Sequence, residues 1–296
     1  MRLCFIVEER YRYDGMPLDV ANQLRDWGHE VELLEPDRAL TAVSELASRR
    51  AQLDAFVLKT VSDGPGLSLH AAARASGHVA INEPAAIRLV RDKAVASAVC
   101  RMHGIPSPLT FFASRAGLLQ EVPAALYPIV VKPANGSSNE DVRLVASPAE
   151  LATLEPGSPR GGFLLAQPYT ENLGRDLKVY CAGGEVFATV QPSPLHPGRG
   201  EVARLIPVEP ALRRLAERVG RIFGLSVYGL DVVESPDGWV VVDVNDFPSF
   251  RLVPDAAALV GDTILRLAAR RRGSVHVRRR RPSPFAAPVP AAVIAP

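Results

Sequence analysis

Short apolar runs alternate with amphipathic segments over the first 60 residues, and this order limits the fold more than any other feature of the chain. The expected elements are a strand at 2–7, a helix at 17–28, a strand at 29–34, a helix at 40–51 and a strand at 53–58. Strands separated by helices at this spacing favour a parallel sheet with crossover helices. The N-terminal part is therefore predicted to be a small α/β lobe.

Further along the chain, the pattern changes from crossover units to hairpins. After a helix over 83–104, the expected elements are strands at 127–133, 143–145, 163–167, 176–183, 186–191, 227–234 and 239–245, with helices at 148–154, 210–223 and 255–270. Gly183-Gly184 and the Ser235–Gly238 segment are typical of the turns that join antiparallel strands. From residue 271 on, Pro, Ala and Arg dominate without periodicity, which predicts a disordered tail over 271–296.

The composition indicates a globular protein and excludes several classes. The chain has 296 residues, of which 47% are hydrophobic and 22% charged, enough for two or three packed lobes. No apolar stretch approaches the length of a membrane span, and the N-terminus does not resemble a signal peptide. Cys4, Cys100 and Cys181 lie far apart, which favours reduced thiols and a cytoplasmic location.

The basic charge is concentrated at the C-terminal end. The formal net charge is +2, yet the segment 270–296 holds seven arginines and no acid, so the remainder of the chain is net acidic. We therefore expect no nucleic-acid partner and no membrane association for the body of the protein. The arginine-rich end is either a solvated terminus or a contact for an acidic partner or a membrane surface.

Lysine is rare in this chain, and each lysine lies in a distinctive motif. Only four of the 34 basic residues are lysines, namely Lys59, Lys93, Lys132 and Lys178. An ammonium group is a compact charge that fits between phosphate oxygens, whereas a guanidinium is a wide fork. Lys132 precedes a loop over 134–139 that contains Gly136, Ser137 and Ser138; this loop is either a phosphate cover or a simple turn. Lys178 alternates with apolar residues, so it faces either a phosphate or solvent.

Oxygen-bearing side chains gather on two strands near the C-terminal end. Asp243 and Asn245 are two residues apart in a strand and face the same side. If the turn at 235–238 pairs the strands, Asp231 faces them across the ladder. Two carboxylates and an amide suit Mg²⁺ that also holds ATP phosphates. The alternative is a solvated strand end.

The order of six motifs resembles the ATP-grasp superfamily. They are Arg91-Asp92-Lys93, YPIVVKP at 127–133, LLAQPYTEN at 164–172, RDLKVYCAGGEV at 175–186, YGLDVV at 228–233 and VVDVNDFPSF at 241–250. The resemblance implies an α/β fold of three lobes, namely an N-terminal parallel α/β lobe (1–82), a small central α+β lobe (83–170) and a C-terminal antiparallel-sheet α+β lobe (171–270). It also implies that ATP and Mg²⁺, with Mn²⁺ as an alternative, bind between the central and C-terminal lobes.

Roles for individual residues follow from the same resemblance. Lys93, Lys132 and the 134–139 loop resemble the groups that contact ATP phosphates, and Asp176 falls among the nucleotide-binding residues. Gln167, Pro168, Tyr169 and Thr170 resemble the hinge that holds adenine through main-chain groups, although Pro168 replaces the usual acid. Asp231, Asp243 and Asn245 resemble the metal ligands.

Two branches of the superfamily share features with this chain. The helix INEPAAIRLVRDK with Gly104-Ile105-Pro106 looks like the ligases that add glutamate to a ribosomal protein and their lysine-biosynthesis relatives. Those usually have Glu at the position of Asp243 and Arg at the position of Lys178. Asp243, Lys178 and the 245–248 run look more like inositol polyphosphate kinases, in which Lys59 would contact a substrate phosphate.

The predicted function is an ATP-dependent carboxylate–amine ligase that forms an acyl phosphate, because an acidic body suits a carboxylate acceptor better than a polyphosphate. A kinase for an inositol phosphate-like polyol and a nucleotide-binding module without turnover are the alternatives. Lys178 and Arg251 are the candidate catalytic residues, and Arg204 is a weaker candidate. The expected partners are a small-molecule or peptide carboxylate and an amine, and a homodimer is one assembly the sequence allows. The six histidines show no metal-binding spacing and receive no role.

Overall fold

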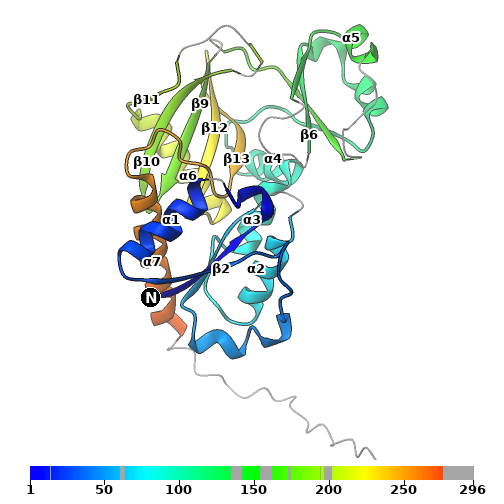
Figure 1. The fold of residues 1–296 in the computed structure, drawn as a ribbon. Helices are drawn as coiled ribbons and strands as arrows, with labels where there is room; N and C mark the ends of the chain where they lie inside the picture. The colour runs from blue at the N-terminus through cyan, green and yellow to red at the C-terminus, as the bar shows by residue number, and fades with distance from the viewer. Residues whose placement is uncertain are drawn as a thin grey trace, which may run out of the picture.

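The structure is a computed structural model of the full chain. It describes residues 1–13, 15–60, 64–134, 142–153, 162–172, 175–193, 195–196 and 202–275. Three four- or five-stranded sheets, each with its own helices, form three lobes (Figure 1). The α/β fold with one parallel and two antiparallel sheets is confirmed, whereas the boundaries at 82, 170 and 270 stay predictions.

The N-terminal lobe is a parallel sheet. Its strands are β1 (Arg2–Val7), β2 (Glu30–Leu34), β3 (Ala55–Lys59) and β4 (Ala80–Ile81), in the order β2-β1-β3-β4, with helices α1 (Gly15–Asp26) and α2 (Gly66–Ala75). The expected helix over 40–51 is wrong: this segment holds two short 3₁₀ turns, Val43–Glu45 and Ser48–Ala51. Only Leu46 of this segment is buried, so no apolar stripe stabilises a longer helix.

Two helices connect this lobe to the next, where the sequence predicted one. Helix α3 covers Pro84–Arg91 and helix α4 covers Lys93–Met102. The break lies at Asp92, whose side chain caps α4. Pro84 begins α3 at a position where proline fits the first turn.

The central lobe is a small antiparallel sheet. Its elements are β5 (Phe111–Ala113), β6 (Ile129–Pro133), β7 (Arg143–Val145), α5 (Pro148–Thr153) and β8 (Leu164–Pro168), and the strand order is β5-β8-β6-β7. Figure 1 shows this lobe, with β6 and α5, projecting to one side of the other two. Lys132 and Gln167 lie on neighbouring antiparallel strands, with Lys132 opposite Leu165 and Gln167 opposite Val130.

The C-terminal lobe is a five-stranded antiparallel sheet. Its elements are β9 (Arg175–Ala182), β10 (Glu185–Pro192), β11 (Arg204–Ile206), α6 (Pro210–Phe223), β12 (Val227–Ser235), β13 (Gly238–Asn245) and α7 (Ala256–Val275), with strand order β11-β10-β9-β12-β13. Helix α7 continues five residues beyond the expected end at residue 270. It packs against α1 of the N-terminal lobe, so the first and the last described helix share one core (Figure 1).

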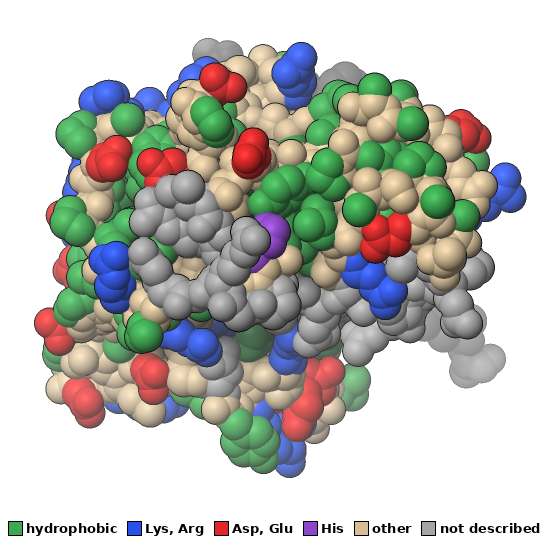
Figure 2. Space-filling model, turned by 90° about the horizontal axis from the view of Figure 1, so that it is seen from above, with side chains coloured by type: hydrophobic (Ala, Val, Ile, Leu, Met, Phe, Trp, Pro, Cys, Tyr) green, Lys and Arg blue, Asp and Glu red, His purple; other side chains and the backbone are tan. Residues whose placement is uncertain are grey.

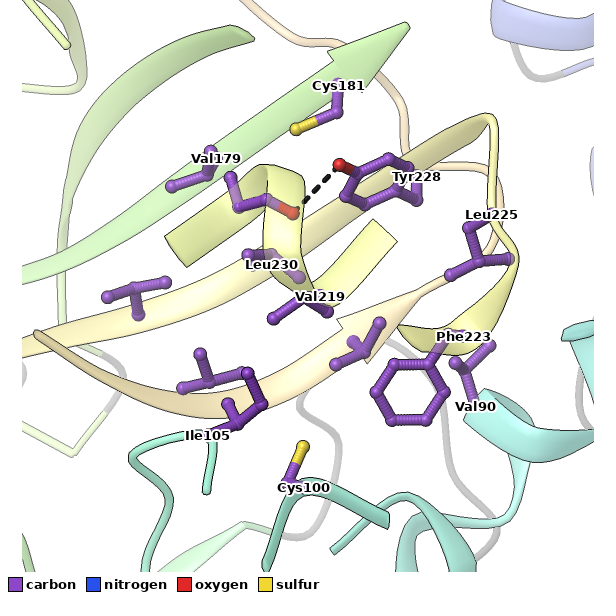
Figure 3. Close-up of a cluster of buried hydrophobic side chains, with 14 of the residues drawn as sticks. Val90, Cys100, Ile105, Val179, Cys181, Val219, Phe223, Leu225, Tyr228 and Leu230 are labelled. Carbon is purple, nitrogen blue, oxygen red and sulfur yellow. Dashed lines mark hydrogen bonds between the residues drawn. The ribbon is translucent and has the colours of Figure 1, made fainter. Parts of the chain in front are cut away.

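The two faces of this sheet have different roles because side chains alternate along each strand. Val179 of β9 and Leu230 of β12 point to a core that helix α6 covers with Val219 and Phe223 (Figure 3). Burying a side chain the size of Phe223 contributes roughly 2–3 kcal/mol. The residues that alternate with Val179 on β9 and with Leu230 on β12 face the other way, toward the central and N-terminal lobes. Among the described helices, none combines the length and apolarity that a bilayer crossing requires.

Candidate functional site

A cleft of about 620 Å³ opens where the three lobes meet, within the size range of small-molecule sites. All described residues that the sequence assigned to a site lie in its lining, except the weaker candidate Arg204. They are Lys59, Lys93, Lys132, Gln167, Pro168, Tyr169, Thr170, Asp176, Lys178, Asp231, Asp243, Asn245 and Arg251. The loop residues Gly136, Ser137 and Ser138 lie outside the described part of the chain. Arg204 is exposed on β11 and is not among the described lining residues.

The floor of the cleft is the face of the C-terminal sheet opposite α6. Strand register sets Asp243 of β13 opposite Asp231 of β12, and Asp231 opposite Lys178 of β9. These three side chains form a charged row across adjacent strands. A β-bulge between Asp231 and Val232 follows directly, a device that re-aims side chains near functional sites. Asn245 lies two residues past Asp243 on the same face, and all three residues line the cleft, while their role as metal ligands stays a prediction.

Both carboxylates of this row are paired with lysines. Lys93 Nζ lies 2.5 Å from Asp243 Oδ2, and Lys178 Nζ lies 2.8 Å from Asp231 Oδ1. Burial raises the pKa of Asp243, but Lys93 and Lys132 outweigh it and leave the pKa below its ordinary value. Burial lowers the pKa of Lys178, and Asp231 more than compensates, so its pKa is raised. At neutral pH the cleft therefore holds an ionised Asp243 carboxylate and a protonated Lys178 ammonium.

Lys132 enters from the central lobe. It is buried at the end of β6, and its Nζ donates a hydrogen bond to the carbonyl oxygen of Val242 at 2.9 Å. Burial lowers the pKa of Lys132, and Lys93 adds to this effect. The contact joins the central lobe to β13, next to Asp243. Three of the four lysines thus meet around one strand end although 85 residues of sequence separate Lys93 from Lys178.

The hinge between the central and C-terminal lobes forms one end of the cleft. Tyr169 donates its backbone N–H to the carbonyl of Pro128 at 2.8 Å, and its hydroxyl lies 2.7 Å from His196 Nε2. Gln167 Nε2 donates to Thr110 Oγ1 at 2.9 Å. His196 and Thr110 had no predicted role, and no local pattern identifies them.

Asp176 faces this end of the cleft from β9, two residues before Lys178. Burial raises its pKa to about 6, with a further rise caused by Asp231. A carboxyl group with this pKa exchanges a proton near neutral pH, unlike Asp243.

The opposite end of the cleft is formed by the N-terminal lobe. Lys59 ends β3 and is buried, with its Nζ 4.8 Å from the ring centroid of Tyr11 and 6.0 Å from that of Phe247. Aromatic faces at this range attract an ammonium group. Tyr11 and Phe247 were not identified from the sequence. The contact between them and Lys59 spans the N- and C-terminal lobes and is invisible to local patterns.

Arg251 projects into the same end from a strained loop. The residues on either side of it have left-handed backbone angles, with φ of 50° at Phe250 and 67° at Leu252. Each such bulky residue costs on the order of 1–3 kcal/mol and is typical of functional sites. Phe250 is buried and stacks on Tyr180, with ring centroids 5.5 Å apart. Packing therefore holds the strained backbone and keeps Arg251 at the cleft.

A buried network of polar contacts joins the N-terminal lobe to the end of β13, where Asn245 lies. Arg91 Nε lies 2.5 Å from Asp246 Oδ1. Asn82 donates to the carbonyls of Val227 (2.7 Å) and Asp246 (2.6 Å), and its Oδ1 accepts from the backbone N–H groups of Ser226 and Val227. Asn82 and Asp246 were missed by sequence reasoning. No local pattern identifies them, because both act through contacts between segments far apart in the sequence.

The donor set of the cleft floor fits magnesium shared with a nucleotide. The described residues contain no group of three or more His, Cys, Asp and Glu side chains arranged for a metal. Asp231, Asp243 and Asn245 offer two carboxylates and one amide oxygen instead. Mg²⁺ is usually held by one or two carboxylates together with substrate phosphates, not by an all-protein cage.

Comparisons with known proteins agree with this geometry. A family model described as "ATP-grasp domain, R2K clade family 3" matches residues 72–260. A probable alpha-L-glutamate ligase from Methanococcoides burtonii is 26% identical over 277 residues, which cover 86% of this chain and 91% of the relative.

Two solved structures are similar over most of the chain. A RimK domain ATP-grasp protein from Sphaerobacter thermophilus has a TM-score of 0.65 at 23% identity, covering 90% of this chain and 100% of the other. The ATP-grasp ligase PsnB, complexed with a phosphomimetic precursor variant, Mg and ADP, has a TM-score of 0.69 at 17% identity, covering 90% and 98%. At these identities the likeness shows the fold.

Proposed function

The chain belongs to the ATP-grasp superfamily, in its R2K clade, and we propose that it is an ATP-dependent ligase that joins a carboxylate to an amine. The observation that supports this most is the convergence of Lys93, Lys132 and Lys178 on the carboxylates of Asp231 and Asp243 in one cleft. Relatives that share most of the chain's length are named probable alpha-L-glutamate ligases.

ATP occupies the part of the cleft between the central and C-terminal lobes. Gln167, Pro168, Tyr169 and Thr170 hold the adenine through main-chain groups, and Asp176 contacts the nucleotide beside them. Pro168 has no N–H, so it offers only its carbonyl. Lys93 and Lys132 contact the phosphates, and their positive charge offsets the charge of the triphosphate.

Asp231, Asp243 and Asn245 would hold the metal ion that accompanies ATP, Mg²⁺ or alternatively Mn²⁺. When bound there, the ion supplies positive charge next to the phosphates. The low pKa of Asp243 keeps this ligand ionised at neutral pH without further help.

The reaction has two steps, and neither needs a protein nucleophile. An oxygen of the acceptor carboxylate attacks the γ-phosphorus of ATP, the bond from that phosphorus to the bridging oxygen breaks, and ADP leaves behind an acyl phosphate. The amine then attacks the acyl carbon, loses a proton and displaces inorganic phosphate, which leaves an amide. Lys178 neutralises the transferring phosphoryl group.

The acceptor carboxylate lies at the end of the cleft formed by the N-terminal lobe. Lys59 and Arg251 provide positive charge there, and the strained loop fixes the direction of Arg251. A small molecule or a peptide that presents a carboxylate fits this end. We place the protein in the cytoplasm, because its three cysteines, Cys4, Cys100 and Cys181, are free thiols and form no disulfide.

The test is a screen of carboxylates with amines, and of phosphorylated polyols, in the presence of ATP and Mg²⁺. A ligase releases ADP and free phosphate in equal amounts and forms an amide. ADP without free phosphate, together with a phosphorylated polyol, would identify a kinase and contradict the proposal. No ADP with any acceptor, alongside tight ATP binding, would identify a binding module instead.

A further inference from the structure

The break between helices α3 and α4 has a cause within the sequence. Asp92 has an extended backbone (φ −87°, ψ 100°), and its Oδ1 accepts hydrogen bonds from the backbone N–H groups of Ala94 at 3.0 Å and Val95 at 3.1 Å. This is an N-cap, which satisfies donors that the first helical turn leaves unpaired. Without a cap at this point, the apolar spacing over 83–104 would allow one continuous helix.

The break determines where the two neighbouring cations point. In a continuous helix, residues two apart project in directions about 200° from each other. On either side of an extended residue they project to the same side. Arg91 meets Asp246 and Lys93 meets Asp243, each at 2.5 Å, so both cations reach the end of β13. A straight helix could bring only one of them there.

The break also makes the backbone N–H of Lys93 available for a contact outside its own helix. As the first residue of α4, Lys93 has an N–H without an acceptor in its own helix. This N–H donates to the carbonyl of Ala134 at 3.4 Å, two residues past Lys132. In a continuous helix it would bond to the carbonyl of Leu89 instead. Lys93 therefore contacts the central lobe through its backbone and β13 through its side chain.

We propose that Asp92 is a positioning residue for nucleotide binding, because its cap on α4 turns the ammonium of Lys93 into the cleft. Asp92 is exposed and is not among the described residues that line the cleft, so it acts through Lys93. The inference rests on the proposed function, since ATP is the ligand whose binding Lys93 supports.

Equilibrium binding of ATP with Mg²⁺ to the full chain tests the proposal. Serine is a good N-cap and alanine is a poor one. Asp92→Ala should weaken ATP binding about tenfold, the effect of losing a contact to a charged group. Asp92→Ser should stay within about threefold of the wild type, because it restores the cap.

Ser147→Ala is the matched control. Ser147 Oγ accepts from the backbone N–H of Glu150 at 3.2 Å at the start of α5, so this variant also loses a helix cap, outside the cleft lining. Its urea midpoint of unfolding should fall while its ATP affinity stays that of the wild type. A similar loss of affinity in Ser147→Ala would show that any weakened helix disturbs binding and would overturn the positioning role.

Repeating the measurement in a Lys93→Met variant separates a positioning role of Asp92 from a general loss of folding. In Lys93→Met, adding Asp92→Ala should weaken ATP binding no further, because the residue through which Asp92 acts is already gone. Wild-type affinity in Asp92→Ala, or an undiminished effect of Asp92→Ala in the Lys93→Met background, would overturn the inference. Absence of ATP binding by the wild type would instead refute the proposed function, and this inference with it.

Discussion

At the scale of single residues, Arg251 can be tested separately from the residues that contact ATP. It lies at the acceptor end of the cleft, between two residues with left-handed backbone. Arg251→Ala should raise the KM for the acceptor carboxylate about 10–100-fold, since a charge-assisted contact is lost, and should leave the Kd for ATP unchanged. Steady-state kinetics with varied acceptor and a direct ATP titration measure the two effects.

The control for this variant is Arg204→Ala. Arg204 is exposed on β11 and is not among the described cleft residues, so both constants should stay at wild-type values. If Arg251→Ala weakened ATP and acceptor binding equally, Arg251 would not define an acceptor end.

His70 predicts a pH dependence of stability. It is fully buried on α2, its Nε2–H donates to the carbonyl of Asn82 at 2.8 Å, and burial lowers its pKa to about 4. The unfolded chain therefore binds more protons than the folded one between pH 4 and 6.5. Stability is fully present above pH 6.5 and falls by about 3 kcal/mol as the pH drops through this window.

Urea unfolding of the wild type and His70→Gln at several pH values measures this contribution. The difference in unfolding free energy between the two should shrink as the pH falls from 6.5 to 4, because only the wild type carries the titrating imidazole. A difference independent of pH would show that His70 titrates normally and is not enclosed as described.

At the scale of elements, helix α6 depends on a close approach to strand β12. A Cβ on Gly220 would overlap the ring and hydroxyl of Tyr228, whose hydroxyl donates to the carbonyl of Ala216 at 2.9 Å. Gly220→Ala should therefore destabilise the protein by about 1–3 kcal/mol, although alanine favours helix more than glycine. Denaturant unfolding with an unchanged m-value checks the effect.

Gly117→Ala provides the comparison for this variant. Apart from Gly117 and its own chain neighbours and turn, no described atom lies within 4 Å of a Cβ built there, so the change should be nearly neutral. A Gly220→Ala protein as stable as the wild type would mean that α6 can move away from β12 without a loss of stability.

Elements with a long periodic pattern were predicted more completely than short ones, although the three-residue strand β7 was also expected. Helix α6 and the β12–β13 hairpin have many alternating or amphipathic positions, and their expected ranges lie within one residue of the observed ones. Strands β5 and β11 have three residues each, too few for an alternation to stand out. The break at Asp92 was missed because the apolar spacing continues across it.

Within the site, the sequence revealed individual residues better than their contacts. The scarcity of lysine singled out Lys93, yet its ion pair with Asp243 spans 150 residues and only the folded chain shows it. Asn82, Asp246 and Phe247 act across lobes in the same way. Their residue types are ordinary, so composition and spacing give no hint of them.

At the scale of the whole molecule, the cleft depends on three lobes contacting one strand end. Lys132 of the central lobe donates to the Val242 carbonyl of β13. Arg91 and Lys93, from the two connecting helices, pair with Asp246 and Asp243 at the end of this strand. Acidic and basic side chains are interspersed over the face seen in Figure 2, so charge of one sign is not concentrated there. Inside the cleft, by contrast, the lysines and aspartates lie in defined pairs, Lys93 with Asp243 and Lys178 with Asp231.

The most direct measurement is a calorimetric titration of ATP, with and without Mg²⁺, into the wild type and Asp243→Asn. We predict that Mg²⁺ strengthens ATP binding to the wild type at least about tenfold, and that Asp243→Asn folds but loses this gain. An Asp243→Asn protein that keeps the full effect of Mg²⁺ would contradict the assignment of Asp231, Asp243 and Asn245 as the site of the ATP-bound metal.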